Sequence, residues 1–390
     1  MLRLSSLALP FAFLLLGAGQ STSIAPPQRP YTTLDNRKLT TPMIDAQVRR
    51  LMDANKVAGL GIAVIRDGKV AFIRSYGYAS LESKAPLTPG TVMYGASLTK
   101  ATFAWMLMQL VDQGRVNLDT PIEKYLPKPL PDYDLYSDLK GDDRWRKLTL
   151  RMLMNHSSGF ANLRWLEDDK KLRFHREPGA RFGYSGEGVR LAQFVLEQGL
   201  GFDVAKEMQS RIFDRYHMNE TSLTWRDDYV GRIAYGYTDS GERQPFAKRS
   251  KVDAAGSMDT SLADWARFLA GVVRGDGMSE AAHAAMIRPT IMIDSPAQFP
   301  TLTDAQTDKW KPLKLGYGVG WGTFQSPYGQ AFFKEGHDDG TDNYAVCIDK
   351  KVSCILLMSN DNRAANVFVP LINSLLGPIG VPAAWEGYRP

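Results

Sequence analysis

The chain has 390 residues, with 47 Lys and Arg against 42 Asp and Glu, so its formal net charge is +5. Hydrophobic residues make up 44% and charged residues 23%, which is ordinary for a globular protein and excludes a disordered, collagen-like or low-complexity chain. The Lys and Arg residues are scattered rather than gathered in a stripe or a tail, so we expect no nucleic-acid partner.

The N-terminus has the pattern of a secretory signal peptide, predicted over residues 1–25. Arg3 is followed by an apolar stretch over 4–19 and then by small residues that suit a cleavage site. An uncleaved membrane anchor is the alternative, but the stretch is shorter than the ~20 residues of a spanning helix and contains Pro10. We expect an exported protein, periplasmic or secreted, with a lead-in segment over 26–42 and no membrane span in its mature form.

Three elements are predicted in the first third of the chain. Apolar residues at helical spacing predict a helix over 43–54. Two β-rich runs on either side of Asp67-Gly68 predict a hairpin over 59–77, because Asp-Gly is a strong turn signal. Over 97–113 apolar residues occupy nearly all sides of a predicted helix, which indicates that this helix is central and buried.

The rest of the chain predicts helices in the middle and strands toward the end. Residues 100–254 have mostly helical patterns with long loops, and a further helix is expected over 261–273. Strands and a last helix follow at 317–324, 331–334, 343–348, 352–358 and 364–376. This order favours an α+β fold: an antiparallel sheet domain formed by 43–99 and 255–390 and flanked by helices, with a mainly helical domain inserted at 100–254.

The chain has two cysteines, Cys347 and Cys354, which excludes a disulfide scaffold and a four-cysteine zinc site. If Lys350-Lys351 forms a two-residue hairpin loop, the two thiols lie directly opposite each other on neighbouring strands. An oxidising compartment would permit a disulfide there. The alternative is two separate thiols packed as small hydrophobic groups, and the sequence leaves both open.

Several catalytic patterns are absent from the sequence. None of the five histidines has a second His or a Cys at metal-ligand spacing. There is no P-loop, no Gly-x-Gly-x-x-Gly after a strand, and no Gly-x-Ser-x-Gly that would indicate an α/β-hydrolase. We therefore do not expect a zinc or iron enzyme.

A serine and a lysine stand three residues apart at the start of the predicted buried helix, in Ser97-Leu-Thr-Lys100. This spacing puts the Ser97 hydroxyl and the Lys100 amine on one helical face. A serine needs a base to become a nucleophile, and a lysine in an apolar site can lose its proton near neutral pH. The motif alone is weak, and a serine N-cap beside a solvated lysine is the alternative.

Two further motifs follow, Phe182-Gly-Tyr-Ser-Gly186 and Gly336-His-Asp-Asp-Gly-Thr341. Together with Ser97-x-x-Lys100 they resemble, in order and spacing, the serine β-lactamase and penicillin-binding-protein superfamily. Within it the chain is similar to the branch that holds class C β-lactamases, D-Ala-D-Ala carboxypeptidases, D-aminopeptidases and β-lactamase-like esterases. The resemblance extends over residues 43–375 and includes the segments 116–127, 153–159, 254–264 and 315–321.

By position, the resemblance implies that Ser97 is acylated, that Lys100 is its base and that Tyr184 shuttles protons. His337 stands at the place of the lysine or histidine of the third motif. The implied oxyanion hole is formed by the N–H groups of Ser97 and Gly340, and the resemblance implies neither a metal nor an organic cofactor. The implied substrate contacts are the neighbours of these motifs, namely Ser185, Gly186, Asp338, Asp339 and Thr341.

Two departures from the family pattern bear on the substrate. The second motif of peptidases and lactamases usually ends in an Asn that holds the substrate's amide, and Gly186 stands there instead. The third motif usually has Gly where Asp339 stands, between Asp338 and Asp342, and carboxylates at this place would repel a substrate carboxylate. The alternative is that these aspartates face away from the cleft or pair with nearby cations, Lys334 and Arg363.

These observations predict a serine hydrolase that forms an acyl-enzyme on Ser97 and favours carboxylic esters or small acyl amides. One alternative is a D-Ala-D-Ala carboxypeptidase or a class C-like β-lactamase. Another is a non-catalytic protein that resembles a penicillin-binding protein. The expected partner is a small ester, amide or β-lactam substrate, and the sequence does not indicate an oligomeric state.

Overall fold

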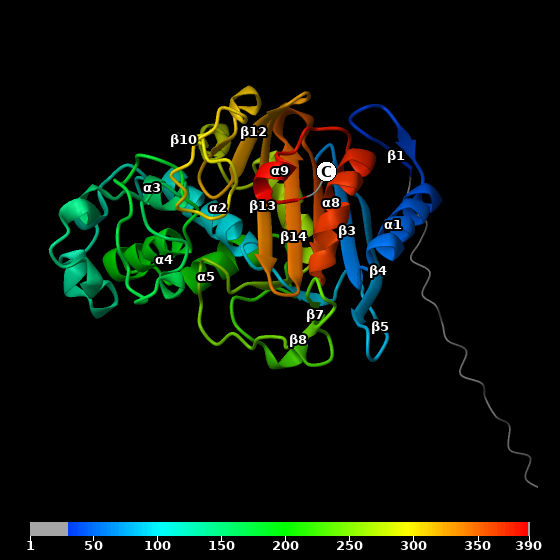
Figure 1. Ribbon diagram of the computed structural model, residues 1–390, viewed down its shortest axis with the longest axis horizontal. Coiled ribbons are helices and arrows are strands. Elements are labelled where there is room, and N and C mark those ends of the chain that lie inside the picture. Colours follow the sequence, from blue (N-terminus) through cyan, green and yellow to red (C-terminus); the bar gives the residue numbers. More distant parts are fainter. Residues whose placement is uncertain (1–29, 389–390) are drawn as a thin grey trace, which may run out of the picture.

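The structure is a computed structural model that describes residues 30–388. The predicted signal peptide and the first residues of the lead-in segment lie outside this range. A nine-stranded antiparallel sheet forms the centre of the molecule, with strands from both ends of the chain (Figure 1). In spatial order these are β10 (Ile291–Met292), β11 (Gly316–Tyr317), β12 (Gly322–Ser326), β13 (Gly329–Asp338), β14 (Thr341–Ile348), β15 (Ser353–Ser359), β3 (Gly59–Arg66), β4 (Lys69–Ser80) and β5 (Ala85–Pro86).

The two ends of the chain meet where β15 pairs with β3 in antiparallel register. β3 and β4 form the predicted hairpin. Its turn has Asp67 and Gly68 at positive φ, 51° and 72°, the conformation that Asp-Gly adopts most readily. The predicted α+β class, with an antiparallel sheet flanked by helices, is confirmed.

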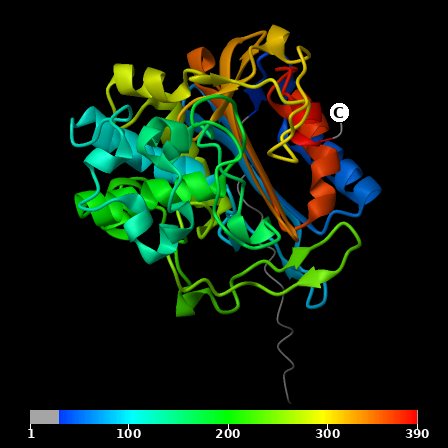
Figure 2. The ribbon, with the colours of Figure 1, turned by 60° about the vertical axis from the view of Figure 1, so that its left-hand side comes forward.

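Helices cover both faces of the sheet (Figure 2). One face carries α1 (Thr41–Asn55), α8 (Ala365–Leu375) and α9 (Ala383–Glu386), and the other carries α2 (Leu98–Asp112), α6 (Leu262–Arg274) and α7 (Glu280–Ile287). Side chains along a strand alternate between the two faces of the sheet. Ile62 and Val64 therefore belong to the hydrophobic core on the face of α1 and α8, while Ala63 and Ile65 belong to the core on the face of α2 and α6. The helices α1, α2, α6 and α8 match the predicted helices closely.

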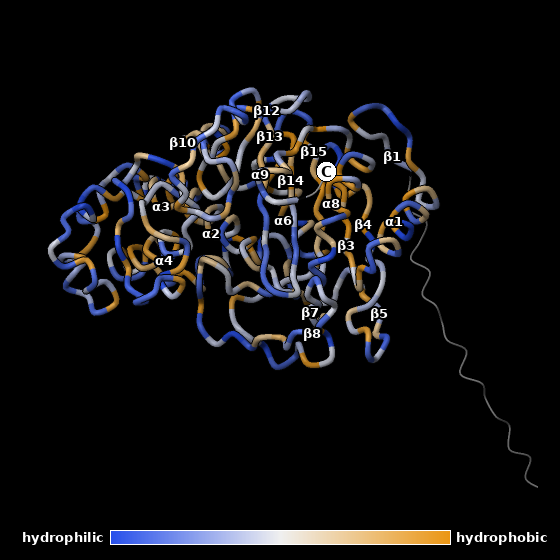
Figure 3. The backbone as a smooth tube through the Cα atoms, in the orientation of Figure 1, coloured by the Kyte–Doolittle hydropathy of each residue, from blue (hydrophilic) through white to orange (hydrophobic). Residues whose placement is uncertain are grey.

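Helix α2 is buried on every side from Leu98 to Leu110, as its apolar pattern predicted. It runs through the predicted boundary between residues 99 and 100, so the assignment of 100–254 as an inserted domain stays a prediction. Apolar segments gather along the central strands and their helices, while outer loops are hydrophilic (Figure 3). Within residues 30–388 no helix combines the length and apolar character needed to cross a bilayer.

The region 100–254 contains less helix than predicted. Its α-helices after α2 are α3 (Leu150–Met154), α4 (Gly186–Phe194) and α5 (Val204–Met208), the last two continuing as π turns η6 (Val195–Gly199) and η7 (Gln209–Phe213). Prolines at 121, 127, 129 and 131 prevent longer helices in the first part. Apart from one short strand pair described below, the remainder is loops and 3-10 turns, η1 (Ile122–Lys124), η2 (Leu130–Asp132), η3 (Asp134–Leu139), η4 (Asp143–Lys147), η5 (Arg164–Leu166) and η8 (Asp227–Tyr229).

The strand predicted over 317–324 is two strands, β11 and β12. Between them the chain turns, because Gly318 N–H donates to Trp321 O and the next two N–H groups donate to carbonyls of Met286 and Met154. Two more 3-10 turns, η9 (Lys311–Leu313) and η11 (Asn362–Ala364), lie on nearby loops. Three small strand pairs complete the fold: β1 (Tyr31–Thr32) with β2 (Lys38–Leu39), β6 (Val92–Tyr94) with β9 (Asp259–Ser261), and β7 (Gly236–Tyr237) with β8 (Arg243–Gln244).

Cys347 and Cys354 form a disulfide and face each other in the register of β14 and β15. The structure therefore has the bridged alternative. The two-residue loop considered for their connection does not form. The strands are instead joined by a 3-10 turn, η10 (Asp349–Lys351), followed by Val352 at φ 44°. The longer connection keeps the same register, which is why the two cysteines still meet.

Candidate active site

Ser97 lies at the N-terminus of α2, after a sharp bend of the chain. The preceding Ala96 has φ 46°, a left-handed conformation that is unusual for a residue with a side chain. The next three N–H groups donate to the carbonyls of residues 95–97, whereas the Ser97 N–H donates to none of the described residues. Asn343 Nδ2, on β14, donates to the Tyr94 carbonyl at 3.0 Å and holds this bend against the sheet.

Lys100 is the polar group next to the Ser97 hydroxyl. Its Nζ lies 2.9 Å from Ser97 Oγ and donates to the Ala255 carbonyl at 2.5 Å. The residue is only 4% exposed, and burial, together with the charge of nearby Lys334, lowers the pKa of Lys100 to about 7. A substantial share of the molecules therefore carries the neutral amine at neutral pH, which is the form a base requires.

Tyr184 precedes α4, and its ring has two lysines nearby. Lys100 Nζ lies 5.2 Å and Lys334 Nζ lies 5.0 Å from the ring centre, and Lys334 donates to the Tyr184 hydroxyl at 3.2 Å. The His156 imidazole packs against the same ring at 4.3 Å between centroids, and its Nδ1 accepts the Ser185 N–H. Burial raises the pKa of Tyr184 and lowers the pKa of His156 well below its usual value, so both are neutral.

The cation of the third motif is Lys334 on β13, not His337. Lys334 is fully buried, and its Nζ donates to Glu335 Oε1 at 2.7 Å. Burial alone would lower the pKa of Lys334, but the charge of Glu335, helped by the neighbouring tyrosines, raises it well above its usual value. The prediction that His337 stands at the position of the third-motif cation is therefore corrected. The reason is geometric: alternate residues of a strand share a face, so the side chains of residues 334 and 336 face α2, whereas that of residue 337 faces away.

Gly336 brings β13 directly against the N-terminus of α2. A Cβ built at Gly336 would lie 2.7 Å from the Gly95 carbonyl oxygen and 3.2 Å from the Ser97 nitrogen. Real Cβ atoms do not approach a backbone oxygen so closely, so a side chain here would push the strand away. The absence of a side chain at 336 therefore lets the strand edge reach Ser97.

The strand N–H predicted for the oxyanion hole, that of Gly340, has a partner within the protein. Gly340 lies in the two-residue turn between β13 and β14, and its N–H donates to Asn362 Oδ1 at 2.6 Å, so it is not free to bind an oxyanion. N–H groups alternate between the two edges of a strand, and the residues that close this turn bond to each other. The His337 N–H then faces the edge beyond the end of β12, beside Ser97. The candidate oxyanion hole is thus the N–H groups of Ser97 and His337.

The His337 side chain forms an ion pair at the rim of the site. Its Nδ1 lies 2.7 Å from Asp342 Oδ1, and this bond raises the pKa of His337, whose side chain is 64% exposed. Asn362 Nδ2 donates to the other Asp342 oxygen at 3.2 Å. Asp342 therefore pairs with His337 rather than with Arg363, which bonds to Asp361 instead.

Of the five predicted substrate contacts, only Asp338 lines the large cavity at Ser97. The Ser185 hydroxyl is buried, caps α4 by accepting the N–H of Gly188 at 3.0 Å, and donates to the Ala161 carbonyl. Gly186 uses its N–H within the protein, bonding to Asn162 Oδ1. The other two, Asp339 and Thr341, line a smaller neighbouring cavity of about 150 Å³.

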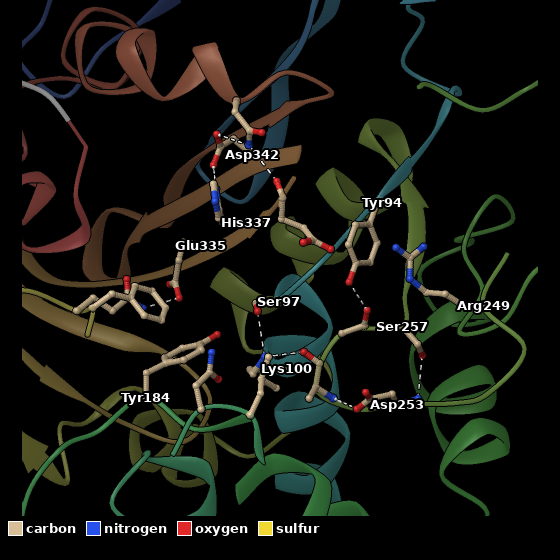
Figure 4. A pocket seen from close by; sticks show the side chains of 18 of the residues that line it. Tyr94, Ser97, Lys100, Tyr184, Arg249, Asp253, Ser257, Glu335, His337 and Asp342 are labelled. Atoms are coloured by element: carbon tan, nitrogen blue, oxygen red, sulfur yellow. Dashed lines mark hydrogen bonds and ion pairs between the residues drawn. The ribbon is translucent and has the colours of Figure 1, made fainter. Parts of the chain in front are cut away.

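The large cavity has a volume of about 1020 Å³ and is lined by Ser97, Lys100 and Tyr184. Figure 4 shows Glu335 and Asp342 on one side of Ser97 and Arg249 on the other. Arg249 pairs with Asp259 at 2.9 Å, which offsets its charge. Other lining residues are the exposed cations and aromatic rings Lys248, Lys251, Trp165 and Phe299.

Sequence reasoning did not assign Lys334, Glu335, His156 or Asn162 to the site. One signal was present, because Lys334-Glu-Gly336 has the Lys-x-Gly pattern, with its lysine three residues before the predicted His337. The roles of His156 and Asn162 depend on contacts with the second motif that only the fold creates. Among the residues 30–388, no group of three or more His, Cys, Asp or Glu is arranged to hold a metal ion.

A family model described as Beta-lactamase matches residues 44–370. A Beta-lactamase from Pseudomonas fluorescens is 24% identical over 237 residues, 58% of this chain and 63% of that protein. Protein flp from Staphylococcus aureus (strain MRSA252) is 23% identical over 220 residues, 53% of this chain and 42% of that protein. A Beta-lactamase from Escherichia coli (strain K12) is 24% identical over 339 residues, 84% of this chain and 79% of that protein. The chain spans less than two thirds of the length of the first two relatives.

Two solved structures share the fold. The octameric penicillin-binding protein homologue from Pyrococcus abyssi has a TM-score of 0.64 at 22% identity, over 83% of this chain and 74% of that chain. The D-alanine carboxypeptidase AmpC from Burkholderia cenocepacia has a TM-score of 0.65 at 19% identity, over 82% and 93%. Since the family model spans all three motifs, the chain belongs to the β-lactamase family, within the superfamily of serine β-lactamases and penicillin-binding proteins.

Proposed function

We propose that this protein is a serine hydrolase that forms an acyl-enzyme on Ser97 and acts on carboxylic esters or small acyl amides. The observation that carries the proposal is the pair of Ser97 Oγ and Lys100 Nζ, 2.9 Å apart, with a lysine pKa of about 7. A hydroxyl beside a neutral amine can be deprotonated as it attacks. A serine that merely caps a helix would not need a buried lysine next to it.

In the proposed reaction, Ser97 Oγ attacks the carbonyl carbon of the substrate while Lys100 Nζ takes the hydroxyl proton. The N–H groups of Ser97 and His337 stabilise the oxyanion. Tyr184, with the charged Lys334 at its hydroxyl, relays this proton from Lys100 Nζ to the leaving group as the bond to that group breaks. The neutral Lys100 amine then takes a proton from the water that attacks the acyl-enzyme, and this proton returns to Ser97 Oγ as the acid is released.

Charge on β13 and β14 supports the preference for substrates without a carboxylate near this edge. Glu335 adjoins Lys334 and neutralises it, so the buried cation of the third motif is not free to bind a substrate carboxylate. The exposed carboxylate of Asp338 adds negative charge to the same wall of the cavity. Esters and neutral amides avoid this repulsion.

The second candidate is a D-Ala-D-Ala carboxypeptidase or a β-lactamase. Lys248 and Lys251 favour it, because both are exposed, line the cavity and carry charge that suits a substrate carboxylate at some distance from β13. The fold likeness to a carboxypeptidase and the family relatives described as Beta-lactamase point the same way.

We also propose that the protein is exported. The N-terminal charge followed by an apolar stretch and small residues supports this, since that pattern directs secretion. The disulfide between Cys347 and Cys354 supports it too, because such bonds persist mainly in oxidising compartments. Fractionation of producing cells, with N-terminal sequencing of the mature chain, tests the export proposal.

The test of the enzyme proposal is labelling with a fluorophosphonate, which reacts with activated serines. The protein should be labelled, the adduct should map to Ser97 by mass spectrometry, and a Ser97→Ala variant should not react. Turnover of a neutral ester, a penicillin and a D-Ala-D-Ala peptide, measured side by side, then separates the two candidates. A folded protein that shows neither labelling nor turnover would be the non-catalytic alternative.

A further inference from the structure

Two neighbouring residues, Leu163 and Asn162, already lie where a side chain at Gly186 would begin. A Cβ built at Gly186 would lie 3.0 Å from Leu163 Cδ2, 3.2 Å from Asn162 O and 3.3 Å from Asn162 Oδ1. Gly186 opens α4 and does not have a positive φ, so its backbone does not require glycine. The atoms nearest to that Cβ thus belong to Leu163 and Asn162, from a different segment, and the amide oxygen of Asn162 is one of them.

The orientation of the Asn162 amide is fixed by one hydrogen bond. Its Oδ1 accepts the Gly186 N–H at 3.0 Å, and only the oxygen of an amide can accept from an N–H. The Nδ2 group donates to no other described residue. Asn162 lines the large cavity together with Ser97 and Tyr184, so this structure holds an uncommitted amide donor at the wall of the candidate active site.

The segment that carries Asn162 is held against the start of α4. The Asn162 carbonyl accepts the Glu187 N–H at 3.0 Å, and the Ala161 carbonyl accepts the Ser185 hydroxyl at 2.9 Å. Arg164 forms an ion pair with Glu187 at 2.8 Å, and the Glu187 side chain is 2% exposed. Asn162 is therefore positioned before any ligand arrives, which lowers the entropy cost of binding to it.

We propose that Asn162 is a specificity-determining residue whose Nδ2 donates to the carbonyl oxygen of an amide within the acyl part of the substrate. A donor with two N–H groups and no partner selects for an acceptor, and an amide carbonyl is a strong neutral one. The residue supplies from the 161–164 segment the group that position 186 lacks. The preferred substrates are then esters or amides whose acyl group itself contains an amide, which deepens and rests on the proposed hydrolase function.

The test compares two chromogenic esters of matched length, the p-nitrophenyl esters of N-acetylglycine and of pentanoic acid. Only the first has an amide in its acyl group. Asn162→Ala should lower kcat/KM for the N-acetylglycine ester about tenfold, the effect of one lost hydrogen bond of ordinary strength. The same variant should keep kcat/KM for the pentanoate ester within about twofold of the parent. Asn219→Ala, an exposed asparagine outside the cavity, serves as the matched control.

An exchange variant separates substrate binding from loop support. Asn162→Gly combined with Gly186→Asn moves the amide side chain from position 162 to position 186. This double variant should recover most of the kcat/KM for the N-acetylglycine ester that Asn162→Ala loses. An equal fall on both esters with a lower Tm in Asn162→Ala would overturn the proposal, as would unchanged kinetics. If Ser97→Ala is as active as the parent on both esters, the hydrolase proposal itself has failed, which is a different result.

Discussion

The two buried lysines beside Tyr184 differ in what lies next to each ammonium group. Lys334 has the Glu335 carboxylate at 2.7 Å, whereas the bonding partners of Lys100 are uncharged, the Ser97 hydroxyl and the Ala255 carbonyl. Both lysines are buried, yet the pKa of Lys100 falls to about 7 and the pKa of Lys334 rises well above its usual value. One carboxylate therefore decides which lysine can lose its proton near neutral pH and which remains a fixed charge.

The largest expected effect comes from removing the group that Lys100 activates. Ser97→Ala should reduce ester turnover about 10⁶-fold, as for other serine nucleophiles, while thermal unfolding stays nearly unchanged. Ser185→Ala is the matched control: it removes the cap of α4, costs about 1 kcal/mol of stability and leaves the acylation site in place. An acyl adduct found on Ser185 would contradict the assignment.

Lys100→Arg keeps the positive charge but removes the base, so turnover should fall about 10³-fold. In the parent protein kcat/KM should rise with pH through about 7, since the lowered pKa of Lys100 leaves the amine protonated and inactive below that pH. The pH–rate profile measures both expectations. Native turnover in the arginine variant, or a profile flat between pH 5 and pH 9, would show that Lys100 is not the base.

Lys334→Met tests the coupling between the two lysines. The positive charge of Lys334 lowers the pKa of Lys100, so removing it should move the acid limb of the pH–rate profile above pH 7. Turnover at the plateau should fall about 10²-fold, because the Tyr184 hydroxyl loses its charged partner. Lys248→Met removes an exposed charge from the same cavity and should leave the limb in place. A limb that stays at pH 7 in Lys334→Met would mean that burial alone lowers the Lys100 pKa.

The smallest effect concerns exposed charge. Asp338→Asn should raise kcat/KM for an anionic cephalosporin, relative to a neutral ester, about threefold at low salt and less at high salt. Asp339→Asn should leave this ratio unchanged, because Asp339 lines only the smaller cavity. Equal ratios in both variants would mean that the exposed carboxylates do not select the substrate and that Glu335 is the residue to change next.

Local patterns in the sequence were sufficient for much of the fold. The Asp67-Gly68 turn, the all-round apolar helix α2 and the strands at both ends were predictable, because each depends on residues close together in the chain. The break between β11 and β12 was not, since it depends on bonds to Met286 and Met154 from other elements. The short helices of 100–254 were also missed, although the prolines there were a local signal.

In the candidate site, too, the features that depend on residues close together in the chain were predictable and those that depend on distant contacts were not. Ser97, Lys100 and Tyr184 come together as the motif order predicted. The cation of the third motif was placed three residues too late. Both Lys334 and His337 suit the first position of that motif in sequence, and the choice depends on which side chains of β13 face helix α2. Contact of Gly336 with Ser97 settles the facing, and that contact joins residues far apart in the chain. Ser185 was predicted to contact the substrate because it follows Tyr184 in the second motif, yet its hydroxyl caps helix α4.

The close approach at Gly336 also limits how this protein can change during evolution. A single added methyl group there meets the Gly95 oxygen, so the strand and the helix must separate by a few tenths of an ångström or more. Such a shift would move the N–H groups of Ser97 and His337 apart, and these are the two donors that the proposed reaction needs. One nucleotide change from Gly to Ala would therefore alter the candidate site while it leaves every side chain of the three motifs in the sequence.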